Sequence, residues 1–157
     1  MNTDVASQSP EELLQAFSAT DYRVRVAGSD YVVRPGRQHE GVDEALARRP
    51  WAIITAFNPN ARQVDDAVNE KQHRLLLDTL ARLGLETYPA VNRDPGGEWP
   101  DEIAVLIVGA DLSELDTLAE WFGQAAIVTG RAGEPARLRL FGEQWPQTLP
   151  DWARRVN

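Results

Sequence analysis

The sequence has no cysteine and few basic residues. Without cysteine, disulfides, zinc–thiolate sites, iron–sulfur ligation and thiol catalysis are excluded, although the compartment stays open. The 157 residues contain 16 Lys and Arg against 24 Asp and Glu, which gives a formal net charge of -8. This balance argues against a protein that binds nucleic acids or anionic membranes non-specifically, because such proteins draw their affinity from basic surface.

Long hydrophobic runs are also missing. The longest, Ile103–Ala110, is strand-sized and far short of the roughly 18 apolar residues of a membrane span. Residues 1–14 have neither a basic start nor an apolar stretch, so we expect no secretory signal. With 43% hydrophobic and 25% charged residues, the composition predicts one soluble, cytoplasmic domain that folds without metal or disulfide staples.

The N-terminal third predicts a capped helix, a hairpin and a second helix. Residues 1–8 are polar and aperiodic, and we expect them to be mobile. Ser9 suits the N-cap of the first helix, with Pro10 at its first position and Glu12 closing a capping box. Two strands and a short helix that Pro50 stops should then follow, at Tyr22–Val26, Tyr31–Arg34 and about Val42–Arg49.

The pattern between residues 51 and 129 decides the predicted fold. It reads strand, helix, strand, strand, helix, strand, over Trp51–Phe57, Asp65–Leu83, Leu85–Val91, Ile103–Val108, Asp111–Phe122 and Ala125–Thr129. This order is typical of the ferredoxin-like split βαβ arrangement, an α+β fold with a mainly antiparallel sheet whose first and third strands are central. A three-layer parallel α/β sheet is the alternative, but the short Arg93–Asp101 connection favours a hairpin over a crossover.

The remaining residues form one further strand and a tail. A strand is expected at Ala136–Phe141, so the single domain spans residues 9–141 and the tail spans residues 142–157. In the tail, Trp145, Leu149, Trp152 and Val156 recur at spacings of 4, 3 and 4, which predicts a short helix from near Pro150. Its apolar face either covers the domain itself or docks on a second copy or another protein.

Several polar motifs are similar to those of a known family. They are Ala19-Thr20-x-Tyr22, Thr55-Ala56-x-Asn58-Pro59, Asn69, Trp99-Pro-x-Glu102, Gly109 and Phe122-Gly123-Gln124-x-Ala126. In order and spacing they resemble a small bacterial family catalogued as a domain of unknown function, number 3293, over about residues 16–140. The resemblance implies no particular reaction. Ile103, Ala104 and Ala125 replace polar residues that the family pattern leads us to expect, so chemistry that depends on those groups would be weakened or absent.

The predicted topology brings these motifs to one end of the sheet. In a split βαβ unit, the end of the first strand, the hairpin between the second and third strands and the start of the fourth strand all lie there. Asn69 lies seven residues before Leu76 on the inward helix face. We therefore expect one polar cleft with two aromatic walls, whose ligand-binding residues are Tyr22, Thr55, Asn58, Arg62, Asn69, Trp99, Glu102 and Gln124.

Each candidate has a structural alternative, which the residue types favour. Asn58 could position a ligand or form an Asx turn, and Arg62 could bind an anion or be solvated. Glu102 adjoins an apolar strand, where a raised pKa would suit general acid or base catalysis, so it is the one catalytic candidate. It could equally bind a loop group structurally. Thr55 and Asn69 could contact a ligand or tie the loop to the helix, and Gln124 is a possible ligand amide.

No motif points to a cofactor or to a metal. His39 and His73 lack a second ligand at recognisable spacing, and the phosphate-binding glycine motifs, the nucleophile elbow and the zinc-protease motif are missing. We thus weigh two hypotheses. The first is a module that binds a small molecule or nucleotide at the polar cleft, with hydrolysis as an option. The second is a protein-interaction or regulatory module without catalysis, in which the polar edge or the C-terminal tail recognises a second copy or another protein.

Overall fold

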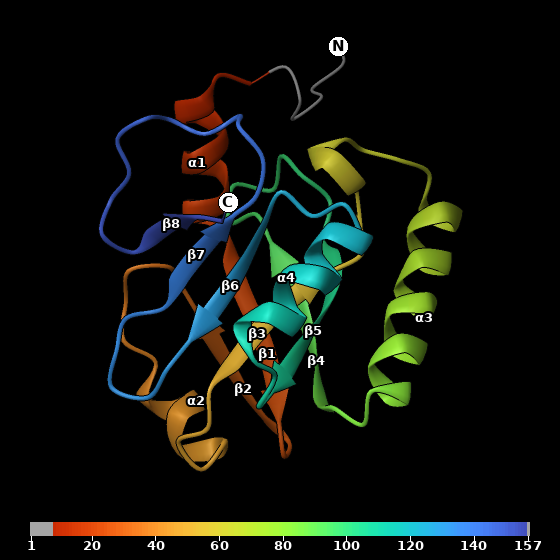
Figure 1. Cartoon of the computed structure of the whole chain (residues 1–157), viewed down its shortest axis with the longest axis vertical. Helices are drawn as coiled ribbons and strands as arrows, with labels where there is room; N and C mark the ends of the chain where they lie inside the picture. The colour runs from red at the N-terminus through yellow and green to blue at the C-terminus, as the bar shows by residue number, and fades with distance from the viewer. Residues whose placement is uncertain (1–7, 157) are drawn as a thin grey trace.

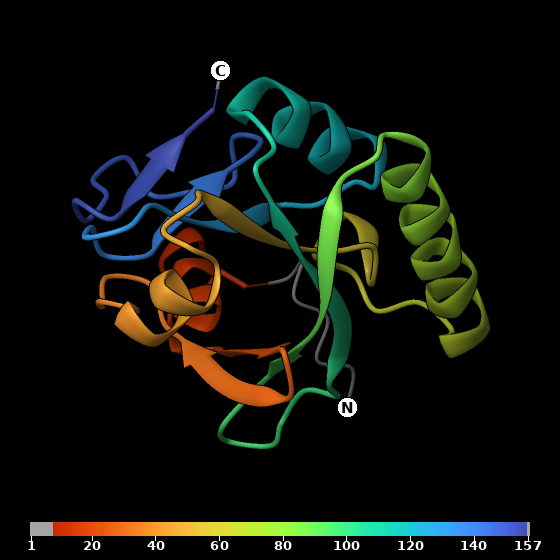
Figure 2. The same ribbon diagram turned by 90° about the horizontal axis from the view of Figure 1, so that it is seen from below.

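The computed structural model describes residues 8–156, and eight strands form a single sheet in it. They are β1 (Asp21–Val26), β2 (Ser29–Val33), β3 (Trp51–Thr55), β4 (Glu86–Arg93), β5 (Glu102–Val108), β6 (Ala126–Gly130), β7 (Arg137–Leu140) and β8 (Ala153–Arg155). The order is β2-β1-β4-β5-β3-β6-β7-β8, and every neighbouring pair is antiparallel except β7 and β8. Figures 1 and 2 show that the sheet is strongly curled.

Four α-helices accompany the sheet, which confirms the α+β class and the mainly antiparallel sheet. They are α1 (Pro10–Ala19), α2 (Glu40–Ala45), α3 (Asp66–Arg82) and α4 (Leu112–Trp121), and a 3-10 turn, η2 (Pro59–Ala61), follows β3. Helices α3 and α4 cover the outer face of the curled sheet, while α1 and α2 lie on its inner side (Figure 2). None of the helices in residues 8–156 is long and apolar enough to cross a membrane.

The side chains of the central strands alternate between two apolar clusters. Along β3, Trp51 and Ile53 enter the cluster shared with α1 and α2, whereas Ala52 and Ile54 enter the cluster beneath α3 and α4. All five β3 residues are buried, and the strand pairs with β5 on one side and β6 on the other. The predicted adjacency of the Trp51 and Ile103 strands is therefore confirmed.

Local sequence signals account for the ends of the helices. The Ser9 hydroxyl accepts from the amide of Glu12 at 3.1 Å and the Glu12 carboxylate accepts from the amide of Ser9 at 3.2 Å, which is the predicted capping box. Asp111 and Glu114 form the same reciprocal pair at the start of α4. The prediction for the second helix was wrong at its C-terminus, because Ala47 and Arg48 adopt left-handed φ values of 54° and 62° and α2 ends at Ala45.

The predicted C-terminal helix is also wrong. Among residues 142–156 the regular element is the strand β8, which pairs in parallel with the outer edge of β7. The Leu138 amide donates to the Trp152 carbonyl and the Val156 amide donates to the Leu140 carbonyl, both at 2.8 Å. Trp145 is only 3% exposed, and its indole packs edge-on against Phe17 of α1. The tail thus packs on the domain. The segment expected to be mobile is residues 1–8, and residues 1–7 of it lie outside the described residues.

Candidate functional site

A cavity of about 430 Å³ lies where α1, the end of β3, the β4–β5 hairpin and the start of β6 meet. Six of the eight predicted site residues line it, namely Tyr22, Thr55, Asn58, Trp99, Glu102 and Gln124. Arg62 is exposed and Asn69 is buried, and neither belongs to the lining. The structure therefore brings together the residues of four separate segments but leaves the predicted arginine outside.

Two asparagine side chains hold Glu102, which is the only carboxylate among the predicted site residues. Asn58 donates from Nδ2 to Glu102 at 2.6 Å, and Asn69 supports Asn58 from behind. The Asn69 Oδ1 accepts from the Asn58 backbone amide at 2.8 Å, and its Nδ2 donates to the Asn58 Oδ1 at 3.0 Å. Asn69 therefore acts as a structural partner, because both ends of its amide are used to fix the loop.

The loop after β3 has an uncommon backbone conformation. Asn58, Asn60 and Ala61 all have positive φ, at 50°, 59° and 56°, in a region that asparagine tolerates better than most residues with a Cβ. The amide of Asn60 donates to the Gly123 carbonyl at 2.6 Å, which joins this loop to the end of α4. The turn then places Arg62 in an extended conformation at the surface, away from the cavity.

Burial changes the pKa of two groups at the cavity wall, the Glu102 carboxyl and the Tyr22 hydroxyl. Burial raises the pKa of Glu102, and the neighbouring Asn58 and Asn92 side chains partly oppose this by hydrogen bonding to the carboxylate. Burial also raises the pKa of Tyr22, whose hydroxyl donates to the Phe17 carbonyl at 2.8 Å. Tyr22 is therefore a neutral aromatic residue of the cavity wall, and its hydroxyl hydrogen is already used in a hydrogen bond.

Gln124 projects from the segment that follows α4. Only 8% of the residue is exposed, and its Nε2 donates to the carbonyls of Phe57 and Phe122, each at 3.1 Å. These two acceptors fix the amide so that nitrogen faces the backbone, and no described residue donates to Oε1. The Thr55 hydroxyl, in contrast, is already used as both donor and acceptor. It donates to the Ile103 carbonyl and accepts from the Phe57 amide.

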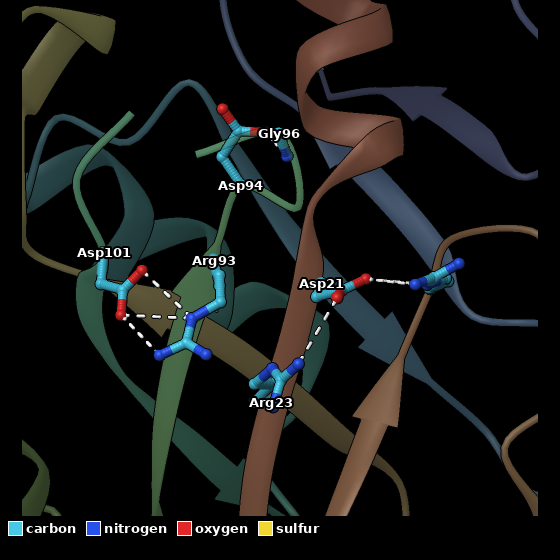
Figure 3. A network of polar contacts seen from close by, with 7 residues as sticks. Asp21, Arg23, Arg93, Asp94, Gly96 and Asp101 are labelled. Atoms are coloured by element: carbon cyan, nitrogen blue, oxygen red, sulfur yellow. Dashed lines mark hydrogen bonds and ion pairs between the residues drawn. The ribbon is translucent and has the colours of Figure 1, made fainter. Parts of the chain in front are cut away.

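The β4–β5 hairpin carries Trp99 to the cavity. Asp94 accepts hydrogen bonds from the amides of Gly96, Glu98 and Trp99 at 3.0 to 3.1 Å, and this carboxylate therefore orders the turn. At the base of the hairpin Arg93 pairs with Asp101 at 3.0 Å, as Figure 3 shows. On the neighbouring strand, Asp21 pairs with Arg34 at 2.6 Å and contacts Arg23 at 3.8 Å (Figure 3).

Sequence reasoning missed several polar residues of the cavity. Glu12 and Gln15 of α1, Gln63 of the loop and Asn92, Asp94 and Glu98 of the hairpin also line it. Asn92 could have been found from hairpin register alone, because it pairs directly with Glu102 across the two strands. Helix α1 gave no such signal, since its position depends on long-range packing of Leu13 and Phe17.

Two comparisons found no match, and one found a family. No curated protein and no solved structure matches the chain. Residues 54–127 match the model of a family described as Protein of unknown function (DUF3293). The predicted resemblance to DUF3293 is confirmed over residues 54–127, a shorter span than the expected 16–140. The matched segment supplies Asn58, Glu102 and Gln124, whereas Tyr22 and the whole of α1 precede it. Part of the cavity wall therefore comes from residues outside the segment that matches the family model.

The histidines lie apart from this cavity. His39 contacts Asp43 through Nδ1 at 2.7 Å in the interior, beside Trp51, and His73 packs edge-on against Phe57 from α3. Within residues 8–156, no group of three or more His, Cys, Asp or Glu side chains is placed to hold a metal ion.

Proposed function

We propose that the protein is a small-molecule-binding module and that the cavity between α1, β3 and the β4–β5 hairpin is its binding site. The observation that carries this proposal is the cavity itself. Its volume of about 430 Å³ falls in the roughly 300 to 1,000 Å³ range of small-molecule sites. Its wall combines aromatic side chains with a few converging polar groups, as such sites usually do.

The fold around the cavity supports a more specific description. We infer that β3, α3, β4, β5, α4 and β6 form a ferredoxin-like split βαβ unit. The order β4-β5-β3-β6, with antiparallel neighbours throughout, supports this inference, as does the position of both helices on one face. The candidate residues then come from the loops at one end of the unit, and α1 closes the cavity.

The charge of the lining favours a small molecule over a nucleotide. Glu12, Asp94, Glu98 and Glu102 line the cavity, and none of its described lining residues is Lys, Arg or His. Phosphate groups bind best to arginine, lysine or free backbone amides, so a nucleotide would meet repulsion here. Hydrolysis is a second candidate function. The raised pKa of Glu102 favours it, because a carboxyl with a pKa closer to neutrality is a better general acid or base.

The protein-interaction alternative has less support from the tail. Trp145 is buried against α1, and Trp152 and Leu149 pack on the same cluster. Those side chains are therefore committed to the domain and are not available as interface anchors.

A thermal-shift screen tests the proposed function. Ala16 of α1 lines the cavity, so Ala16→Trp should fill it, whereas Ala67→Trp adds the same indole to an exposed position on α3. Binding raises stability by RT ln(1 + [L]/Kd), so compounds that bind the cavity should raise the melting temperature of the wild type and of Ala67→Trp. They should not raise that of Ala16→Trp. Hits that stabilise both variants equally would refute the assignment of the site.

A further inference from the structure

Three polar side chains of the cavity wall already use donors within the protein. The Asn58 amide bridges Glu102 and Asn69, the Tyr22 hydroxyl donates to a carbonyl, and the Thr55 hydroxyl donates to another. A ligand that carries only hydrogen-bond acceptors therefore finds no free hydrogen on the Tyr22 or the Thr55 hydroxyl.

Two amide oxygens at the cavity have no donor among the described residues. Gln124 is more than nine-tenths buried and lines the cavity, and its Nε2 is held by two backbone carbonyls, which leaves Oε1 without a hydrogen bond. Asn92, opposite Glu102 on the paired strand, has a buried Oδ1 without a partner. Because an unmade hydrogen bond of a buried group is costly, the Asn92 Oδ1 favours a ligand that supplies an N–H group, and the Gln124 Oε1 offers such a ligand a second acceptor.

The charged side chains that line the cavity around these oxygens are all acidic. The four carboxylates at the wall are not neutralised by any basic lining residue, and the nearby Arg93 is turned to Asp101 at the base of the hairpin (Figure 3). The aromatic lining residues Phe17, Tyr22, Phe57 and Trp99 add ring faces or edges to the same wall. Aromatic faces attract cations, and carboxylates form strong charge-assisted hydrogen bonds with N–H donors.

From this arrangement we infer that the cavity binds a small organic cation whose ammonium or amidinium group lies between Glu102 and Gln124. The inference rests on the proposed function and narrows it to a ligand class. The cationic group donates to the Glu102 carboxylate and to the Gln124 Oε1, and the organic part of the ligand lies against the aromatic wall. Carboxylates and phosphate esters are excluded as ligands because they would add negative charge next to Glu102.

Three probes of the same size and different charge test the inference. Benzylammonium, benzyl alcohol and benzoate share one ring and differ at the group that would meet Glu102. Each is titrated at neutral pH into the full chain, and binding is followed by NMR at the Gln124 side-chain amide and the Trp99 indole. Both groups line the cavity, so their signals report binding at this site.

The expected result is that benzylammonium binds at least tenfold more tightly than benzyl alcohol and that benzoate does not bind. Glu102→Gln keeps the shape of the side chain and an acceptor for Asn58, but removes the charge. It should weaken benzylammonium binding roughly tenfold to a hundredfold, as expected for a hydrogen bond to a charged group. Glu120→Gln, an exposed position on α4 outside the cavity, is the matched control and should leave the affinity unchanged.

The contrary results separate this inference from the proposed function. Perturbation of Gln124 and Trp99 by benzyl alcohol or benzoate at the same concentrations as benzylammonium would overturn the cation preference and leave a small-molecule site. Equal affinity of Glu102→Gln and wild type for benzylammonium would overturn the role of the charge. If none of the three probes perturbs either residue, the inference is refuted, and the cavity-filling screen with other compounds decides the proposed function independently.

Discussion

Replacing Asn69 by alanine tests how the cavity loop is held. The Asn69 side chain is 3% exposed and makes two hydrogen bonds to Asn58, one to its backbone amide at 2.8 Å and one to its side-chain oxygen at 3.0 Å. Asn69→Ala removes both bonds and leaves the Asn58 amide without the acceptor it has now. Since Asn58 has a left-handed backbone, these two bonds also stabilise a conformation that is unfavourable in isolation.

The expected loss of stability follows from these contacts. Each hydrogen bond contributes about 0.5 to 1.5 kcal/mol net, and alanine returns about 0.5 kcal/mol through its higher helix propensity. The two bonds together contribute about 1 to 3 kcal/mol, so after the return from alanine the free energy of unfolding should fall by roughly 0.5 to 2.5 kcal/mol. At about 2 to 4 °C per kcal/mol for a chain of this size, the melting temperature should fall by roughly 1 to 10 °C.

Urea denaturation with matched variants provides the assay. Glu70→Ala changes the adjacent, exposed position of α3 and should leave the unfolding free energy nearly unchanged. Asn69→Asp keeps an acceptor for the Asn58 amide but places a buried carboxylate oxygen against the Asn58 Oδ1, so at neutral pH it should destabilise the protein at least as much as Asn69→Ala. If Asn69→Ala is as stable as Glu70→Ala, the loop does not depend on Asn69 and the reasoning is refuted.

Three further perturbations address the two clusters and the buried carboxyl. Leu76→Ala and Leu80→Ala each create a cavity under α3 and should each cost about 2 to 5 kcal/mol in urea denaturation, whereas Leu77→Ala, at a position 39% exposed, should cost much less. Equal effects at all three positions would contradict this packing. Truncation after Phe141 removes the buried Trp145 and should lower the unfolding midpoint of the monomer, so unchanged stability would show that the tail does not complete the domain. Because burial raises the pKa of Glu102, ionisation of this group lowers stability as the pH rises above its ordinary value of 4.5 and on through its raised value. Glu102→Gln should remove that loss, and identical pH profiles of unfolding free energy for the two proteins would disprove it.

The parts of the fold that could be predicted depend on local chemistry. The capping boxes at Ser9 and Asp111 each lie within four residues, and the one at Ser9 was predicted from the sequence. The apolar run of β5 and the alternation in β1 reflect strands buried on two faces and on one. Such signals need no knowledge of the partner segment, so they fix the elements and much of their order.

The failures concern segments whose structure depends on distant partners. The spacing of Trp152 and Val156 suits a helix, but β7 presents an open edge that only the folded sheet reveals, and β8 pairs with it. Arg62 was placed in the cleft on the assumption of a simple exit from β3. A left-handed turn begins at Asn58 instead, and Arg62 lies exposed after it, outside the cavity lining. That turn depends on Asn69 and Gly123, which are 11 and 65 residues from Asn58.

The burial of β3 on both faces has a consequence for how the cavity opens. Its five residues are buried and paired with β5, and Trp51, Ala52 and Ile53 are also paired with β6. Their amide hydrogens should therefore exchange with solvent only in global unfolding. The left-handed loop and the tip of the β4–β5 hairpin are largely exposed and should exchange through local opening at much lower free energy. Amide hydrogens of β3 should therefore exchange slowly and those of the two loops at the cavity should exchange fast. Opening of these loops would let a ligand enter and leave while β3 stays folded.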